Sequence, residues 1–547
     1  MIASTKRIQK ILILVGPLMS LAVTPWTNFD PINLVKLCVL SSAAFYILGI
    51  LLSLSWKFDR FQKILLGVIV FFLISMTVTF FTSGAPTNQQ FWGVFGRNTG
   101  YLTYFCLLII LFSTVVVSNT IFYRNILKTL IITAIPVTIY CLIQIAKLDP
   151  ITWSSKQVFA TFGNTNFLSA FLGMSSIATF TMTLNKDFSS RKKIIFLCFA
   201  LLQVGVVKFA DSIQGILMFG IGIVVFFGNY IFTNYKNCRF PYLLASLLMG
   251  FGFLFGLGNK GPLANLLYQP SLLLRLDYWH AGFVMTLKHP VVGVGLDSYG
   301  DWYREYRGSI STMRTDPERT ANVAHNIFLD LSSTGGFPLL FAYLSIILIG
   351  FYVSIKFLKN QKNFDVVFAG IFSCWIAYLA QALISINQIA VGIWGWLLTG
   401  ATIGYALSSN VNLHEKKLKK NFANLSVKTS LMSLIFLVIG VLVSIFPLKT
   451  DADYRSARNH GDLNKLMTSS TQAGSTAFHL SNVISLAIEN NYLDQAKTLN
   501  NILVSKYPRE LYGWRIIANL SKYSDSEKKS ARIKISDLDP FNPNNPR

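Results

Sequence analysis

The sequence predicts an all-α, polytopic membrane protein with about 13 transmembrane helices, a long exterior loop and a C-terminal helical domain. Of its 547 residues, 52% are hydrophobic and only 13% are charged, with a mean hydropathy of +0.49. A soluble protein carries about a quarter charged residues. Apolar runs recur along the first part of the chain, each near the ~20 residues that a helix needs to cross a bilayer. No strand alternation is visible, and helices satisfy backbone polar groups internally in hydrocarbon.

The predicted spans follow one another with short connections. They comprise residues 11–27, 32–54, 62–82, 100–118, 122–146, 165–184, 194–208, 212–233, 240–258, 326–355, 365–386, 390–408 and 429–447. One long polar stretch, residues 259–324, interrupts the series, and a polar segment follows the last span. We therefore predict a membrane domain over residues 1–447, containing the exterior loop 259–324, and an extracytoplasmic helical tail over residues 448–547.

The distribution of positive charge predicts the orientation of the chain in the membrane. The net charge of +24 at first suggests a nucleic-acid partner. With the N-terminus in the cytoplasm, however, 22 lysines and arginines fall in cytoplasmic segments, including the lysine-rich connection around residues 416–428, against five in the short exterior connections. This asymmetry follows the positive-inside rule and suits anionic membrane lipids, so we expect no nucleic-acid partner. It places the loop 259–324 outside the cytoplasm, and with 13 spans the tail as well.

The exterior loop contains the residues that favour chemistry. Residues 272–287 have helical spacing, which places Arg275 and Trp279 on one face. Residues 301–307 can form a short helix that places Arg304 and Arg307 together. His325 stands where the next apolar run begins.

These residue types suit a lipid-borne anionic substrate such as a sugar on a polyprenyl pyrophosphate. Pyrophosphate is a good leaving group, so the site needs cations to hold it and a base for an attacking hydroxyl. Arginine binds phosphate bidentately, and histidine titrates near neutrality. Arg275 is the candidate phosphate ligand and His325 the candidate base. Further substrate-binding candidates are Arg97, Arg304, Arg307, Trp279 and Lys208.

Each candidate also has a structural interpretation. Arg275 can pair with Asp277, and His325 can act as a helix cap. Arg304 and Arg307 can simply face water or lipid headgroups, Trp279 can anchor at the interface, and Lys208 can pair with Asp211. No His, Asp, Glu or Cys cluster has metal-ligand spacing, so no metal or other cofactor is expected.

The tail reads as helices joined by short turns. Residues 473–489 and 492–507 predict an antiparallel helix pair, and residues 496–508 match the spacing of a tetratricopeptide repeat. The alternative is a small helical cap on the membrane domain.

Several of these segments together resemble the O-antigen ligase/polymerase superfamily, which includes protein O-oligosaccharyltransferase relatives. The motifs are Arg275-x-x-x-Trp279, His289-Pro290-x-x-Gly293-x-Gly295, Ala324-His325-Asn326-x-x-Leu329, Gly335-Gly336, Gly163-Asn164-x-Asn166-Phe167 and Gly96-Arg97, and they cover most of residues 80–400. The resemblance implies a metal-independent, inverting glycosyltransferase of the bacterial inner membrane. It implies transfer from undecaprenyl pyrophosphate on the periplasmic face, with the family's loop arginine and histidine at Arg275 and His325.

One motif departs from the family pattern. Many members have Ser-Arg-Gly at the exterior start of a middle span, where this chain has Ser212-Ile213-Gln214-Gly215. The resemblance leaves three acceptors open: lipid A core, a growing polysaccharide, or a protein. A lipid-linked saccharide transporter or flippase without catalysis is the alternative, although no inverted halves are visible.

Overall fold

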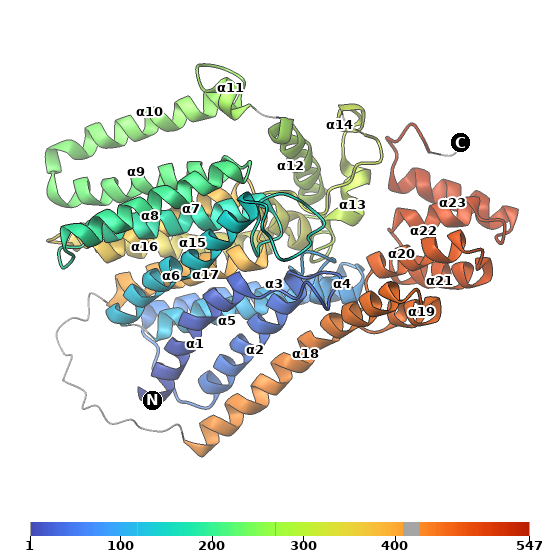
Figure 1. Ribbon diagram of the computed structural model, residues 1–547, viewed down its shortest axis with the longest axis horizontal. Coiled ribbons are helices and arrows are strands. Elements are labelled where there is room, and N and C mark those ends of the chain that lie inside the picture. The colour runs from blue at the N-terminus through green and yellow to red at the C-terminus, as the bar shows by residue number, and fades with distance from the viewer. Residues whose placement is uncertain (1, 118, 269, 315, 409–425, 546–547) are drawn as a thin grey trace.

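The computed structural model of the protein describes residues 2–117, 119–268, 270–314, 316–408 and 426–545. Within these ranges every regular element is a helix and none is a strand. The helices form a long bundle with the C-terminal helices at one end (Figure 1). The prediction of an all-α, polytopic membrane protein is thus confirmed. The lysine-rich connection expected around residues 416–425 lies outside the described residues.

Each of the thirteen apolar runs coincides with one helix. These helices are α1 (Ile2–Leu21), α2 (Asn33–Leu52), α3 (Arg60–Thr82), α5 (Tyr101–Val116), α6 (Thr120–Ile145), α7 (Thr165–Met182), α8 (Ser190–Phe209), α9 (Gln214–Asn234), α10 (Arg239–Leu257), α15 (Ile327–Asn360), α16 (Val366–Ala382), α17 (Ile389–Ser408) and α18 (Val427–Asn459). Among the described residues, eight helices are long and apolar enough to cross a membrane, namely α2, α3, α6, α9, α10, α15, α17 and α18. Helices α5 and α16 are apolar but shorter. Helices α1, α7 and α8 have 20, 18 and 20 residues and pack against these spans.

Helix α17 forms the centre of the bundle. Its apolar window is fully buried, and it packs against α1, α5, α15 and α16. Glycines permit this close packing, since a Cβ added at Gly395 would lie 2.1 Å from the ring of Tyr378. Small residues at helix contacts let membrane helices approach closely. Helix α10 is the opposite case, because only 6% of its apolar window is buried and its surface is left for lipid.

The segments predicted to be exterior gather at one end of the bundle. The connection after α1 reaches α18, because the Asn28 side chain donates to the Leu448 carbonyl at 2.8 Å. Asp451 of α18 accepts from the backbone N–H groups of Phe29 and Asp30 at 2.7 and 3.0 Å. The short helix α4 (Thr87–Trp92) lies at the same end, beside the long loop (Figure 1).

The described residues of the long loop form four helices: α11 (Ala264–Leu267), α12 (Pro270–Lys288), α13 (Tyr299–Tyr306) and α14 (Ser309–Arg314). The predicted helices at 272–287 and 301–307 correspond to α12 and α13. The next candidate span begins beside Asn326 as expected, at Ile327, but α15 is kinked at Gly336 (φ 72°, ψ −178°). The Phe337 N–H donates to the Pro290 carbonyl at 2.8 Å, and the Val294 N–H to the Ser333 carbonyl at 2.8 Å. The loop therefore packs against the kink, which divides α15 into two helical parts, residues 327–335 and residues 337–360.

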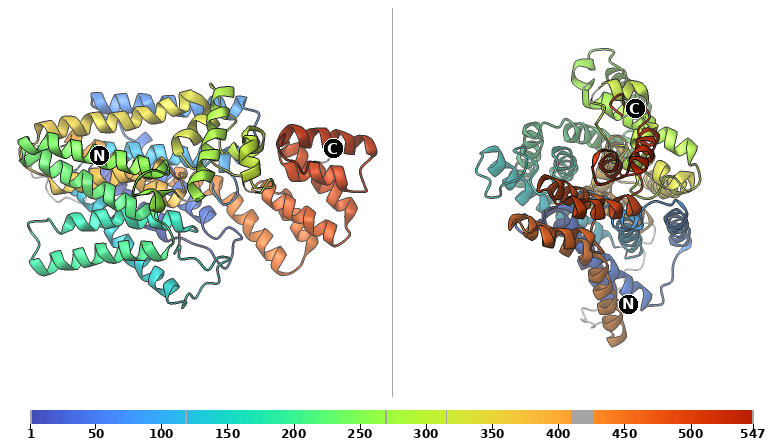
Figure 2. Two further views of the ribbon diagram at one scale, coloured as in Figure 1. Left: turned by 90° about the horizontal axis from the view of Figure 1, so that it is seen from above. Right: turned by 90° about the vertical axis from the view of Figure 1, so that its right-hand side faces the viewer.

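Helix α18 continues into the tail without a break. The composition changes near Pro447, yet the helix runs to Asn459. Tyr454 and Ala457 near its end belong to a second apolar core, shared with α19–α21. The tail helices are α19 (Leu463–Thr471), α20 (Ala477–Glu489), α21 (Leu493–Lys506), α22 (Leu511–Asn519) and α23 (Asp525–Leu538). Helices α20 and α21 form the predicted pair, and the tail projects beyond the bundle (Figure 2). The division of the chain at residue 447 stays a prediction.

Candidate active site

A small apolar core holds the exterior loop together and fixes the position of His325. Tyr278 of α12 and Tyr299 of α13 are buried together with Ala324. The Tyr299 hydroxyl donates to the Tyr278 carbonyl at 2.6 Å, which ties α12 to α13. The ring of His325 stacks on Tyr278, with centroids 5.5 Å apart and an interplanar angle of 29°. His325, the residue predicted as the base, thus packs against the buried core of the loop.

The backbone at His325 is held in an unusual conformation. Its φ is 53°, in the left-handed region that residues other than glycine seldom adopt. On one side Ala324 donates its N–H to Asp330 Oδ1 at 2.6 Å. On the other side Asn326 caps α15 by accepting from the N–H groups of Phe328 and Leu329 at 3.0 and 3.1 Å. Such conformations are found where the surroundings impose them, often at functional sites.

Two arginines from different segments approach His325. Arg275 comes from α12, and Arg97 from the turn between α4 and α5. Burial, assisted by the positive charges of Arg97 and Arg275, lowers the pKa of His325 to about 3. The imidazole is therefore neutral at physiological pH. The structure brings three of the predicted site residues together from segments about 180 and 50 positions apart in the sequence.

Asp297 organises the turn that carries Arg97. Its carboxylate accepts the Val94 N–H at 2.7 Å and the Thr99 hydroxyl at 3.1 Å, and its charge attracts the Arg97 guanidinium. A Cβ added at Gly93 (φ 92°) would lie 2.6 Å from Asp297 Oδ2, so the turn needs a glycine there. Sequence reasoning missed Asp297; the signal available was its place in the glycine-rich turn after α12.

Arg275 does not pair with Asp277, which was the alternative to a role in phosphate binding. Asp277 pairs with Arg314, at 2.8 Å, rather than with Arg275. No carboxylate among the described residues forms an ion pair with Arg275. Burial lowers the pKa of Arg275, as expected for a cation withdrawn from water. A partly buried cation without a carboxylate partner suits an anionic ligand.

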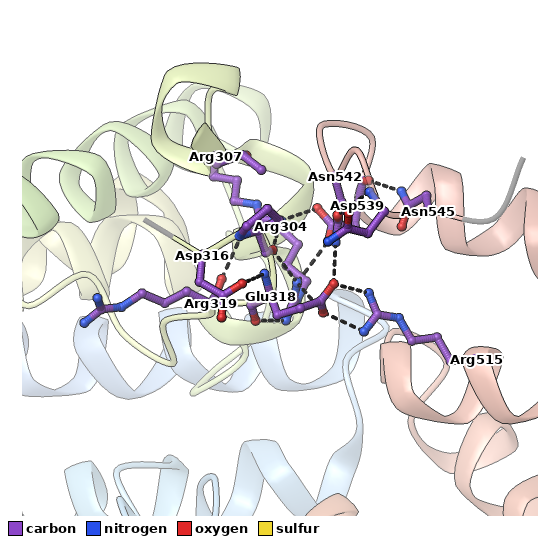
Figure 3. Close-up of polar contacts among 12 residues, drawn as sticks. Arg304, Arg307, Asp316, Glu318, Arg319, Arg515, Asp539, Asn542 and Asn545 are labelled. Carbon is purple, nitrogen blue, oxygen red and sulfur yellow. Dashed lines mark hydrogen bonds and ion pairs between the residues drawn. The ribbon is translucent and has the colours of Figure 1, made fainter. Parts of the chain in front are cut away.

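Arg304 and Arg307 bind the tail instead of facing the site. Both reach Asp539 at the end of α23, at 2.9 Å for Arg304 and 2.6 Å for Arg307 (Figure 3). Arg307 also donates to the carbonyls of Pro317 and Arg319, at 2.7 and 2.9 Å, and is only 2% exposed. These contacts occupy both guanidinium groups, so we do not carry the expected substrate role of Arg304 and Arg307 forward.

The remaining candidates differ in their surroundings. Trp279 lies one turn after Arg275, and its indole N–H is buried without a hydrogen-bond partner among the described residues. Lys208 is exposed in the last turn of α8, and within the described part of the chain it forms no ion pair.

Gln214 lies in the stretch that the resemblance aligns with the Ser-Arg-Gly of many family members. It is 3% exposed at the start of α9, and neither atom of its amide has a partner among the described residues. The residues around it join α7 to α9, since Ser212 donates to Asn166 at 2.8 Å and the Gly215 N–H donates to Ser169 at 2.7 Å. The motif that contains Asn166 and the motif that contains Gln214 therefore pack against each other.

The described residues contain no group of three His, Cys, Asp or Glu side chains placed to hold a metal ion. The positive charge at the site comes from the arginines.

Residues 196–344 match the family model described as O-antigen ligase. The matched stretch runs from α8 to the middle of α15 and includes Gln214, Arg275 and His325. A search of curated protein sequences finds no match to the chain. The apolar helices indicate an integral membrane protein, and the match over residues 196–344 supports membership of the O-antigen ligase superfamily and a glycosyltransferase of the O-antigen ligase/polymerase type.

Proposed function

We propose that this protein transfers a glycan from undecaprenyl pyrophosphate to an acceptor hydroxyl, without a metal. The observation that carries the proposal is the meeting of Arg97, Arg275 and the neutral imidazole of His325 at the exterior end of the bundle. The acceptor is lipid A core, a growing polysaccharide or a protein. We place the site on the periplasmic face of the bacterial inner membrane, because the arrangement of lysines and arginines puts this end outside.

Each residue has one role in the proposed reaction. Arg275 and Arg97 hold the pyrophosphate oxygens. His325 takes the proton from the acceptor hydroxyl as its oxygen bonds to the anomeric carbon. The bond from that carbon to the pyrophosphate oxygen breaks at the same time, and the negative charge stays on the lipid pyrophosphate beside the arginines. Attack from the face opposite the leaving group inverts the anomeric configuration.

Donor binding also adjusts the base. A group with a pKa of about 3 is a weak proton acceptor at neutral pH. The negative pyrophosphate offsets the charges of Arg97 and Arg275, which contribute to that low pKa. We therefore expect the pKa of His325 to rise when the donor binds, so that the base becomes effective only with substrate in place.

The test separates donor binding from turnover in the purified, lipid-reconstituted protein. His325→Ala should lower turnover by about 10²- to 10⁴-fold, the usual contribution of general base catalysis, while donor binding persists. Near-normal turnover in this variant would exclude His325 as the base.

The same assay tests the phosphate ligand. Arg275→Lys keeps the charge but loses the bidentate geometry, and should weaken donor binding by about 10- to 100-fold. Arg314→Lys is the matched control, because Arg314 lies in the same loop and pairs with Asp277. Equal effects of the two substitutions would remove Arg275 from the site.

A further inference from the structure

A cleft of about 450 Å³ separates the exterior loop from the tail. The end of α4 and helix α13 form one wall, and α20 and α22 form the other. A smaller cavity of about 90 Å³ shares Asp301 and Glu510 with it. Ligand pockets commonly enclose about 300–1,000 Å³, so the cleft is large enough for a small ligand.

The cleft adjoins the candidate active site. Val94 lines the cleft, and its N–H donates to Asp297, which holds the turn of Arg97. At the other rim, Asn322 lies three residues before His325. The cleft is therefore lined by residues of the two segments that carry Arg97 and His325, although neither of these two side chains lines it.

The arginines of the cleft wall are already paired with carboxylates. Arg304 binds Asp539 at 2.9 Å. Arg515 binds Glu318 through two contacts, at 2.6 and 3.0 Å (Figure 3). Arg509 pairs with Glu305, and its guanidinium lies 3.4 Å from the centre of the Trp302 ring. The wall thus offers no unpaired arginine to an anionic ligand within the described part of the chain.

Two carboxyl groups line the cleft, those of Asp301 and Glu510, and neither forms an ion pair with a cation of the described residues. Asp301 accepts from the Gln89 side chain at 2.8 Å, and Glu510 accepts from the Tyr512 N–H at 3.3 Å. Burial raises the pKa of Asp301 to about 7 and also raises the pKa of Glu510. Buried carboxyl groups with few donors are stabilised by ligands that bring hydroxyl groups.

The other wall residues suit the same ligand. Neutral amides and hydroxyls come from Asn322, Asn482 and Ser481. Phe95 and Phe478 stack at 4.1 Å and give the cleft an apolar aromatic surface. Hydrogen-bonding groups beside an aromatic surface, with no unpaired cation, fit a neutral polyhydroxylated molecule better than a phosphate.

We propose that this cleft binds the sugar units of the acceptor and presents their hydroxyl to His325. The proposal rests on the proposed glycosyl transfer and adds its acceptor class, a saccharide. It also gives the tail a role, because α20 and α22 form half of the binding site.

The experiment measures binding and transfer separately in the full-length protein. The probe is a mixture of short oligosaccharides released from the surface polysaccharide of the producing bacterium, with binding followed by saturation-transfer NMR. Ser481→Trp fills the cleft, and Glu510→Gln removes an acceptor charge while keeping the cap on Tyr512. Asn490→Trp and Glu489→Gln are controls at the exposed far end of α20.

We expect Ser481→Trp and Glu510→Gln to weaken oligosaccharide binding by about tenfold or more and to raise the acceptor KM equally. Donor binding and the two control variants should stay at the wild-type level. Oligosaccharide binding that is undetectable in the wild type or unchanged in both cleft variants would overturn the proposal. The proposal would also be overturned if the wild type bound a serine-rich peptide instead of the oligosaccharide, and the cleft variants lost that peptide binding. If instead the cleft variants behave as expected but His325→Ala and Arg275→Lys keep full activity, the mechanism proposed above fails while the saccharide site stands.

Discussion

The ionisation of His325 links the residue to the pH dependence of the enzyme. The imidazole accepts a proton only when neutral, so the rate must fall as the pH drops through its pKa. In the free protein this pKa is about 3. Because kcat/KM reports the free enzyme and kcat the donor complex, we expect the acid limb of kcat at a higher pH than that of kcat/KM. Steady-state rates across the acidic range measure both limbs. Coincident limbs, or a kcat limb that survives in His325→Ala, would contradict the argument.

Some of the site residues could be predicted from the sequence and others could not. Arg275 and His325 lie in local motifs with enough context to be recognised, and the structure brings both to Arg97. Arg304 and Arg307 lie in the same loop, but their partner Asp539 is 232 positions from Arg307. No local pattern indicates a partner that distant. Asp297 was missed for a similar reason, because the N–H groups that it binds belong to a turn about 200 residues earlier.

At the scale of single elements, the break in α15 is the feature that the apolar pattern could not reveal. Hydropathy predicts one span from residue 326, because the residues around Gly335 and Gly336 are apolar enough to continue it. The break depends instead on a positive φ and on the loop that packs into it, and neither leaves a mark on hydropathy.

Gly336→Ala should destabilise the exterior loop. The added Cβ would lie 2.4 Å from the Val291 carbonyl, and the φ of 72° adds backbone strain. Gly84→Ala is a close control, since Gly84 has φ 71° but nothing within 4 Å of the added Cβ. The control should cost about 1 kcal/mol from backbone strain alone. Gly336→Ala should cost clearly more and lower the transfer rate, as thermal unfolding and activity assays can measure. Equal losses of stability would mean that packing at the break is unimportant.

At the scale of the whole molecule, the tail is fastened to the loop by buried charge. Asp539→Ala would leave Arg307 buried without its carboxylate, which typically costs about 3–5 kcal/mol. We expect the tail to detach and the acceptor KM to rise, with proteolysis at the α18–α19 turn reporting detachment. Asp537→Ala, an exposed carboxylate two residues earlier in α23, should change neither. A tail that stays protected in Asp539→Ala would show that other contacts suffice.

The orientation in the membrane is tested on the same scale. All segments that meet near His325 lie at one end of the bundle, so a single topology reporter shows on which side of the membrane they all lie. Fusions at Ser309 should read periplasmic and fusions at Lys362 cytoplasmic. A cytoplasmic signal at Ser309 would move the whole site to the other face and exclude a periplasmic donor.

Helix α18 is one continuous helix of 33 residues, with Pro447 inside it, that runs from the membrane into the tail. At 1.5 Å per residue it is about 50 Å long, well beyond the ~30 Å hydrocarbon layer. Membrane helices adjust their tilt when the bilayer becomes thicker or thinner. A tilt change of ~10° would displace the far end of such a rod by roughly 9 Å. We therefore expect bilayer thickness to act on the tail through α18, against the ion pairs of Arg304, Arg307 and Arg515 that hold the tail to the loop.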